Sequence, residues 1–176
     1  MGMLQLELFA LRKTVDDGLV EVLREFAAQT PSVDEKMRTG DMHISDWSLF
    51  DSPHPLISKQ RTELTGIAST MIGKDVRICD AWFHISRTGS AFGRHNHTEV
   101  GEGTNFENRL SMVYYVDRGD PDGAGDLRMY EPDMLIGPET GMILIFPAHV
   151  QHEVFEYRGQ RDRIIIGCNL EIMPAA

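Results

Sequence analysis

From residue 76 onward the sequence is divided into short apolar segments that turn-forming residues separate. The segments are rich in the β-branched and aromatic side chains that favour extended strands. They cover Val76–Ser86, Ala91–Arg94, Leu110–Asp117, Asp126–Glu131, Met142–Phe146, Glu153–Tyr157 and Arg163–Ile172. Turn signals such as Thr88-Gly89 and Gly137-Pro138 lie between them. Short strands in such a succession bury their apolar faces by folding into a sandwich or a barrel.

The N-terminal part of the chain has a helical rather than a strand-like period. Asp16–Gln29 repeats apolar residues at helical spacing, and Pro55–Gly73 does the same, with a glycine as its stop signal. The segment between them, Ser32–Pro55, is polar and predicts a loop with short structure.

These patterns together predict a mainly β protein. The expected fold is a double-stranded β-helix, a jelly roll or cupin-like barrel, flanked by N-terminal α-helices. We expect a single domain over residues 1–176, with a helical support region at 1–75 and the jelly-roll core at 76–176.

Composition excludes several classes of protein. The 176 residues carry a formal net charge of −10, which would repel a nucleic-acid backbone. No run of about 18 apolar residues is present, so no membrane span is expected, and the first residues lack the features of a signal peptide. Cys79 and Cys168 lie in apolar strand-like segments, and we expect buried, reduced thiols in a cytoplasmic protein.

A histidine pair and a distant third histidine form the strongest functional pattern. In His95-Asn96-His97, positions i and i+2 of an extended chain point to the same side, so both imidazoles can bind one ion. His152, which follows His97 by 55 residues, precedes a strand and would reach the pair across the barrel. Three protein ligands on one face leave positions open for a substrate and O₂, as in the facial triad of non-haem iron(II) oxygenases.

The stretch Gly89–Ile172 carries further motifs in a particular order. They are Arg94-His95-Asn96-His97, Val113-Tyr114-Tyr115-Val116, Phe146-Pro147 with His152-Glu153-Val154, and Arg163 at the start of an Ile-rich strand. In this order and spacing the stretch resembles the iron(II)/2-oxoglutarate-dependent oxygenases, notably prolyl-hydroxylase-like members and a group of uncharacterised bacterial and phage homologues. The resemblance covers about half of the chain, the half expected to form the barrel.

The resemblance implies a role for each matching residue. The three histidines would bind iron(II), and Arg163 would pair with the distal carboxylate of 2-oxoglutarate. Tyr115 matches the family tyrosine whose hydroxyl joins the arginine at that carboxylate. Asn169 is a candidate for contact with the co-substrate or the substrate.

Arg163 also suits this role on physical grounds. A guanidinium binds a carboxylate through two parallel hydrogen bonds. On its strand Arg163 faces the same way as Gly167 and Asn169, so it points into the barrel, where an unpaired cation is destabilising. Arg161 has the same parity, but it lies nearer the turn, where we expect it to be solvated.

Position 97 departs from the family pattern, because most members have Asp or Glu there and this chain has His97. Three neutral imidazoles leave iron(II) with its full charge and should hold it less tightly than a set with a carboxylate. The alternative register His97-Thr98-Glu99 would restore the carboxylate. We favour the first pair of histidines, with Glu99 as an outer partner that orients a ligand ring.

The remaining histidines and some aromatic residues receive no role. His149 is the alternative to His152, but it belongs to a loop, whereas a strand begins directly after His152. Residues without a partner pattern are His43, His54 and His84. For Trp82 and Phe92, core packing is favoured over a place at the cavity mouth.

We therefore expect an iron(II)- and 2-oxoglutarate-dependent oxygenase that hydroxylates an unidentified small-molecule or peptide substrate with O₂. Two alternatives stay open: a tri-histidine cupin-type dioxygenase that does not use 2-oxoglutarate, and a non-catalytic barrel that binds a metal or a small ligand. No nucleic-acid or membrane partner is expected. Exposed edge strands would allow a homodimer.

Overall fold

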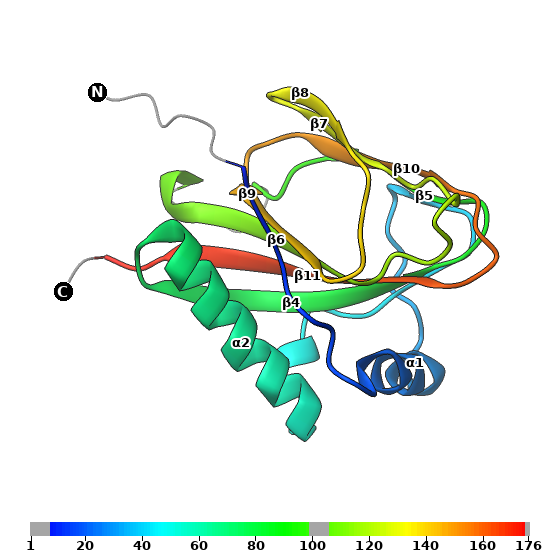
Figure 1. Cartoon of the computed structure of the whole chain (residues 1–176), viewed down its shortest axis with the longest axis horizontal. Helices are drawn as coiled ribbons and strands as arrows, with labels where there is room; N and C mark the ends of the chain where they lie inside the picture. The colour runs from blue at the N-terminus through cyan, green and yellow to red at the C-terminus, as the bar shows by residue number, and fades with distance from the viewer. Residues whose placement is uncertain (1–7, 99–105, 175–176) are drawn as a thin grey trace.

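Two antiparallel β-sheets face each other in the computed structural model, which describes residues 8–98 and 106–174 (Figure 1). The six-stranded sheet, in spatial order, contains β1 (Phe9–Arg12), β9 (Met142–Pro147), β6 (Arg109–Asp117), β11 (Arg163–Ile172), β4 (Val76–Ser86) and β3 (Met42–Ile44). The five-stranded sheet contains β2 (Arg38–Thr39), β5 (Ser90–His95), β10 (His152–Tyr157), β7 (Leu127–Tyr130) and β8 (Asp133–Ile136). From β4 to β7 and again from β8 to β11 the chain alternates between the sheets. This alternation confirms the predicted double-stranded β-helix.

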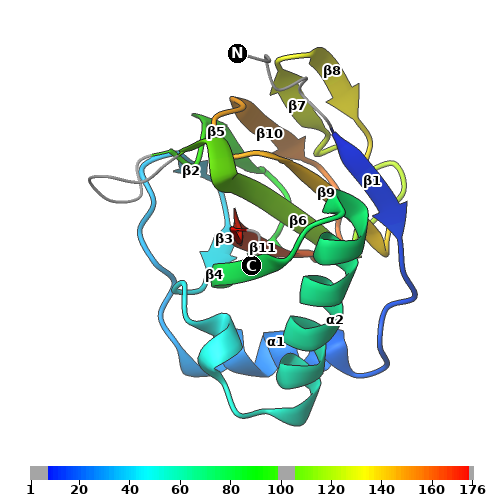
Figure 2. The ribbon, with the colours of Figure 1, turned by 90° about the vertical axis from the view of Figure 1, so that its left-hand side faces the viewer.

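The two α-helices cover the outer face of the six-stranded sheet (Figure 2). They are α1 (Leu19–Gln29) and α2 (Pro55–Ile72), and the 3₁₀ turns are η1 (Leu49–Asp51) and η2 (Phe106–Asn108). Buried leucines of both helices, such as Leu23 and Leu64, belong to one apolar core with the facing strands. α2 ends as predicted, because Gly73 adopts a left-handed φ of 70°. No helix in the described ranges combines the length and the apolar character that crossing a membrane requires.

Alternation along β11 and β4, two strands of the six-stranded sheet, places polar side chains between the two sheets. On β11, the residues that face the helices are Ile164, Ile166, Cys168 and Leu170. Those that line the space between the sheets are Arg163, Ile165, Gly167 and Asn169. On β4, the residues that line this space are Asp80, Trp82, His84 and Ser86. The predicted inward direction of Arg163 is therefore observed.

A bulge in β4 decides which of its residues face inward. The pairing of β4 with β11 shifts between Asn169 and Leu170, so Cys79 has no partner in the ladder. The extra residue reverses the alternation, and apolar residues on both sides of it face the helices. Cys79 is the bulged residue and is exposed, so the prediction that it is buried is wrong. Cys168 is buried as predicted, and both thiols are free.

Short strands that the sequence did not reveal complete the sheets. From the N-terminal region β1 pairs with β9, β3 with β4 and β2 with β5, and later in the chain β8 pairs with β7. These strands are two to four residues long, too short for an alternating pattern to be recognised. The first 75 residues thus contribute strands as well as the predicted helices.

Candidate metal and co-substrate site

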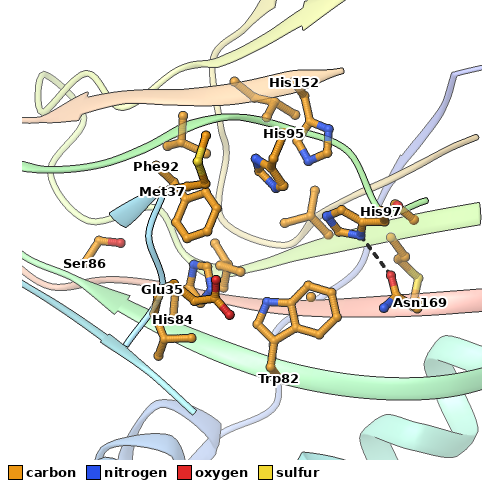
Figure 3. A pocket seen from close by; sticks show the side chains of 18 of the residues that line it. Glu35, Met37, Trp82, His84, Ser86, Phe92, His95, His97, His152 and Asn169 are labelled. Atoms are coloured by element: carbon orange, nitrogen blue, oxygen red, sulfur yellow. Dashed lines mark hydrogen bonds between the residues drawn. The ribbon is translucent and has the colours of Figure 1, made fainter. Parts of the chain in front are cut away.

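Three histidines from two separate parts of the chain meet between the sheets (Figure 3). His95 ends β5 and His152 begins β10, and the two residues pair directly across the ladder, with ring centroids 4.2 Å apart. His97 lies two residues beyond β5, where its backbone N–H donates to the carbonyl of Ala148 at 2.9 Å. One ring nitrogen from each histidine lies within 4.8 Å of the others. The chain therefore brings together the three histidines that the sequence indicated.

The sequence offered two alternative metal ligands, His149 and Glu99. His149 is exposed and does not belong to the cluster, because it lies in the connection before β10 rather than on the strand. Glu99, the alternative carboxylate ligand, lies outside the described residues.

Backbone carbonyls orient two of the rings. His95 Nδ1 donates to the carbonyl of Gly93 at 2.8 Å, and His152 Nδ1 donates to the carbonyl of Val150 at 2.9 Å. Because a carbonyl oxygen only accepts, both imidazoles carry their proton on Nδ1. Nε2 then carries a free lone pair, as a metal ligand requires.

A chain of side chains orients the third ring. His97 Nδ1 donates to Asn169 Oδ1 at 2.8 Å (Figure 3). Asn169 Nδ2 in turn donates to Asp80 at 2.7 Å. The carboxylate accepts from the amide nitrogen, so the amide oxygen faces His97. Burial raises the pKa of Asp80, and the hydrogen bond from Asn169 opposes this change. Both polar atoms of Asn169 are thus engaged in orienting His97, a task that the sequence did not indicate.

Burial keeps the three imidazoles neutral at neutral pH. It lowers the pKa of His152 to about 3 and that of His97 to about 4, and it also lowers the pKa of His95. The neighbouring imidazoles lower the pKa of His97 and His152 further. Only neutral imidazole coordinates a metal, so this donor set fits a divalent transition-metal ion such as iron(II).

Arg163 provides a buried cation in the same cavity. The residue is 3% exposed, and its Nε and Nη1 have no hydrogen-bond partner among the described residues. Gly125 lies so close that a Cβ atom there would be 2.6 Å from Nη1. A buried guanidinium with unpartnered donors is destabilising unless an anion meets it, so the arrangement fits a ligand with a carboxylate.

Tyr115 lies next to the guanidinium of Arg163, whereas Arg161, the other candidate arginine, is exposed. The guanidinium carbon of Arg163 lies 5.4 Å from the ring centroid of Tyr115, and both residues line the cavity. Burial raises the pKa of the Tyr115 hydroxyl, which therefore stays protonated and can donate a hydrogen bond. Arg161, the competing arginine, is exposed and pairs with Asp117 at 2.9 Å.

These groups line one cavity of about 660 Å³, within the range of small-molecule sites. Trp82 and Phe92 also line it, although the sequence favoured core packing for both. Lining residues that the sequence did not connect with a site include Glu35, Trp47 and His84. Alternation beyond the bulge would have indicated His84, but Glu35 and Trp47 lie on loops, where no periodic pattern applies.

A family profile described as the 2OG-Fe(II) oxygenase superfamily matches residues 81–171, a range that includes the three histidines and Arg163. The chain therefore belongs to this superfamily and is an iron(II)- and 2-oxoglutarate-dependent oxygenase. No curated protein matches the sequence significantly.

Solved structures share the fold at low sequence identity. The viral collagen prolyl hydroxylase of Paramecium Bursaria Chlorella virus-1, in complex with 2-oxoglutarate, is 13% identical, with a TM-score of 0.67 over 94% of this chain and 96% of that chain. A Trichoplax adhaerens prolyl hydroxylase in complex with a hypoxia inducible factor peptide is 14% identical, with a TM-score of 0.67 over 94% and 83%. HygX from Streptomyces hygroscopicus, with nickel, 2-oxoglutarate and hygromycin B bound, is 11% identical, with a TM-score of 0.64 over 94% and 83%. These similarities agree with the jelly-roll fold.

Proposed function

We propose that His95, His97 and His152 hold the iron(II) of this oxygenase. We propose further that Arg163 and Tyr115 bind the distal carboxylate of 2-oxoglutarate. One observation carries both assignments. Three neutral imidazoles, each with its Nδ1 hydrogen-bonded, offer their free nitrogens to one point of a cavity that also holds a buried guanidinium with unpartnered donors.

The reaction that we propose is hydroxylation of a small-molecule or peptide substrate. When bound, iron(II) and 2-oxoglutarate supply the oxidising chemistry, in which O₂ is consumed, 2-oxoglutarate gives succinate and CO₂, and one oxygen atom enters a C–H bond. The protein fixes the ring orientations and keeps the cavity largely apolar through buried residues such as Phe146 and Leu127. Related folds bind a peptide and hygromycin B, which supports both classes of substrate. A cytoplasmic location and a homodimer stay predictions from the sequence.

The absence of a carboxylate from the proposed ligand set has a consequence for binding. Three imidazoles leave the charge of a divalent ion unneutralised, so the anionic co-substrate would supply the balancing charge. Each ligand should then strengthen the binding of the other, by the reciprocity of linked equilibria. We expect the iron(II) affinity, measured by competition with a chelator, to rise when 2-oxoglutarate is present.

Anaerobic titration tests the proposed function. Iron(II) and 2-oxoglutarate together should produce a visible charge-transfer band that neither gives alone. Absence of this band, with O₂-dependent turnover of a substrate retained, would favour the cupin-type dioxygenase. Absence of both would favour a non-catalytic barrel.

Substitution of Glu99 tests the choice of ligands. Glu99→Gln should leave iron(II) stoichiometry unchanged, whereas His95→Ala should lower it, as measured by metal analysis of the anaerobically loaded protein. Loss of iron from the Glu99 variant together with retention in the His95 variant would show that the alternative register is correct.

A further inference from the structure

One acidic side chain in the cavity is left over after the metal and co-substrate groups are assigned. Among the described residues, the charged side chains that line the cavity are Glu35, Asp80 and Arg163. Asp80 accepts a hydrogen bond from Asn169, and Arg163 is assigned to the co-substrate. Within the described ranges, the carboxylate of Glu35 has neither a hydrogen-bond nor an ion-pair partner. The part of the cavity near Glu35 therefore carries an unbalanced negative charge.

The loop that carries Glu35 is attached to both sheets. Before it, the N–H of Val33 donates to the carbonyl of Ile44 in β3 at 2.8 Å. After it, the carbonyl of Met37 accepts from the N–H of Gly93 in β5, also at 2.8 Å. Figure 3 shows the carboxylate of Glu35 directed toward the space that Trp82 also borders. Glu35 is therefore held at the edge of the cavity rather than on a free loop.

Two indole rings border the same cavity. A Cβ atom at Gly167 would lie 2.5 Å from the Trp82 indole, so the missing side chain at this position makes room for the ring. The Trp82 ring centroid lies 5.6 Å from that of His97, which places the indole beside the proposed metal site. Trp47 is 44% exposed, and its carbonyl accepts from the N–H of Ala81 at 3.1 Å, which fixes it next to β4.

We propose that this part of the cavity binds a positively charged amino or ammonium group of the primary substrate, with Glu35 as its counter-ion and Trp47 and Trp82 as its aromatic walls. Indole faces attract cations, and the attraction grows when the site excludes water. A carboxylate adds charge-assisted hydrogen bonds. The inference rests on the proposed function. Because Trp82 lies beside His97, a cation bound there would place a neighbouring carbon atom of the substrate near the proposed metal site.

The tryptophans of this chain provide a direct readout. The sequence contains two tryptophans, and both line the cavity. Tryptophan fluorescence therefore reports occupancy of the cavity without any need for turnover. The probes are benzylammonium and benzyl alcohol, which share a planar apolar body and differ in charge. Each is titrated anaerobically into protein that is loaded with iron(II) and 2-oxoglutarate.

We expect benzylammonium to bind about tenfold more tightly than benzyl alcohol, which corresponds to an ordinary cation–π and charge contribution. Glu35→Gln keeps the side-chain size and removes the charge. This variant should bind benzylammonium at most about threefold more tightly than benzyl alcohol. Asp34→Asn is the matched control, because it removes the same charge from the neighbouring residue, whose side chain is 98% exposed and pairs with Arg38. The control should keep the wild-type ratio.

Equal affinity of the wild-type protein for the two probes would overturn the proposal, and so would no fluorescence response to either probe. A preference for the cation that Glu35→Gln leaves intact would overturn it as well. The charge-transfer band of iron(II) and 2-oxoglutarate, recorded in the same samples, distinguishes failure of the cation-site proposal from failure of the proposed function. A band without a cation preference refutes the substrate class alone, whereas a cation preference without the band refutes the oxygenase assignment of the site.

A third probe distinguishes the sources of the cation. Nα-acetyl-lysinamide presents the amino group on a peptide-like chain. Tighter binding of this probe than of benzylammonium would identify a lysine side chain of a peptide as the cation, and weaker binding would identify a small-molecule amine. Both results support the cation site, provided that Glu35→Gln weakens the binding.

Discussion

Replacement of Arg163 by leucine should have opposite effects on the free protein and on co-substrate binding. In the free protein the guanidinium is 3% exposed, with two nitrogens that lack partners among the described residues. A buried donor without an acceptor costs about 1–3 kcal/mol. Arg163→Leu removes both donors and loses the contact with Tyr115, which is worth about 1 kcal/mol. Because the cost of two unpartnered donors exceeds the value of the lost contact, the variant without ligands should be about 1–4 kcal/mol more stable than the wild type.

Binding of 2-oxoglutarate should change in the other direction. A guanidinium that holds a carboxylate through two charge-assisted hydrogen bonds contributes about 3 kcal/mol. Loss of this pair weakens 2-oxoglutarate binding by about 100-fold. Iron(II) affinity without co-substrate should stay within about threefold, because no ligand atom changes.

Urea unfolding of the ligand-free protein and calorimetric titration with 2-oxoglutarate measure the two effects. Arg161→Leu is the control, because Arg161 has the same charge but its side chain is 62% exposed and pairs with Asp117. A variant that unfolds much more easily than the wild type, or that binds 2-oxoglutarate normally, would refute the reasoning. So would equal weakening of iron(II) and 2-oxoglutarate binding.

Three further predictions concern the metal ligands and the stability of the fold. His152→Ala should abolish stoichiometric iron binding while His149→Ala retains it, as determined by metal analysis; the reverse result would move the ligand to the loop. Asn169→Ala should weaken iron(II) binding about 10–100-fold in a chelator competition, because the third imidazole loses its orienting partner, and an unchanged affinity would contradict this role. The hydrogen bond from Lys59 and further contacts lower the pKa of Asp16 from 3.8 to about 2, so the ionised carboxylate stabilises the fold above pH 4, and this contribution disappears as the pH falls toward 2. Asp16→Asn should remove about 1 kcal/mol at pH 7 and flatten the pH dependence of urea unfolding in that window, whereas an identical pH dependence in the two proteins would contradict the assignment.

Local periodicity predicted a large part of the fold. The longer strands appear in the sequence as short apolar segments between turn signals, and both helices appear as a period of 3.6; β4 and β11 have the predicted bounds. A period of two placed Arg163 on the inner face of its strand, and it placed His95 and His97 on one side of an extended chain. These features depend on neighbours within a few residues, so the sequence contains them directly.

The sequence by itself thus determined the strand pattern, the histidine motif and the direction of the arginine. Only the tertiary structure decided which partners complete the site. The pairing shift at Cys79 sets which residues of β4 face the cavity, and it depends on register against β11. The link from His97 through Asn169 to Asp80 joins three separate segments. Glu35 reaches the cavity because its loop is hydrogen-bonded to both sheets, and contacts between segments so distant in the chain leave no periodic signal in the sequence.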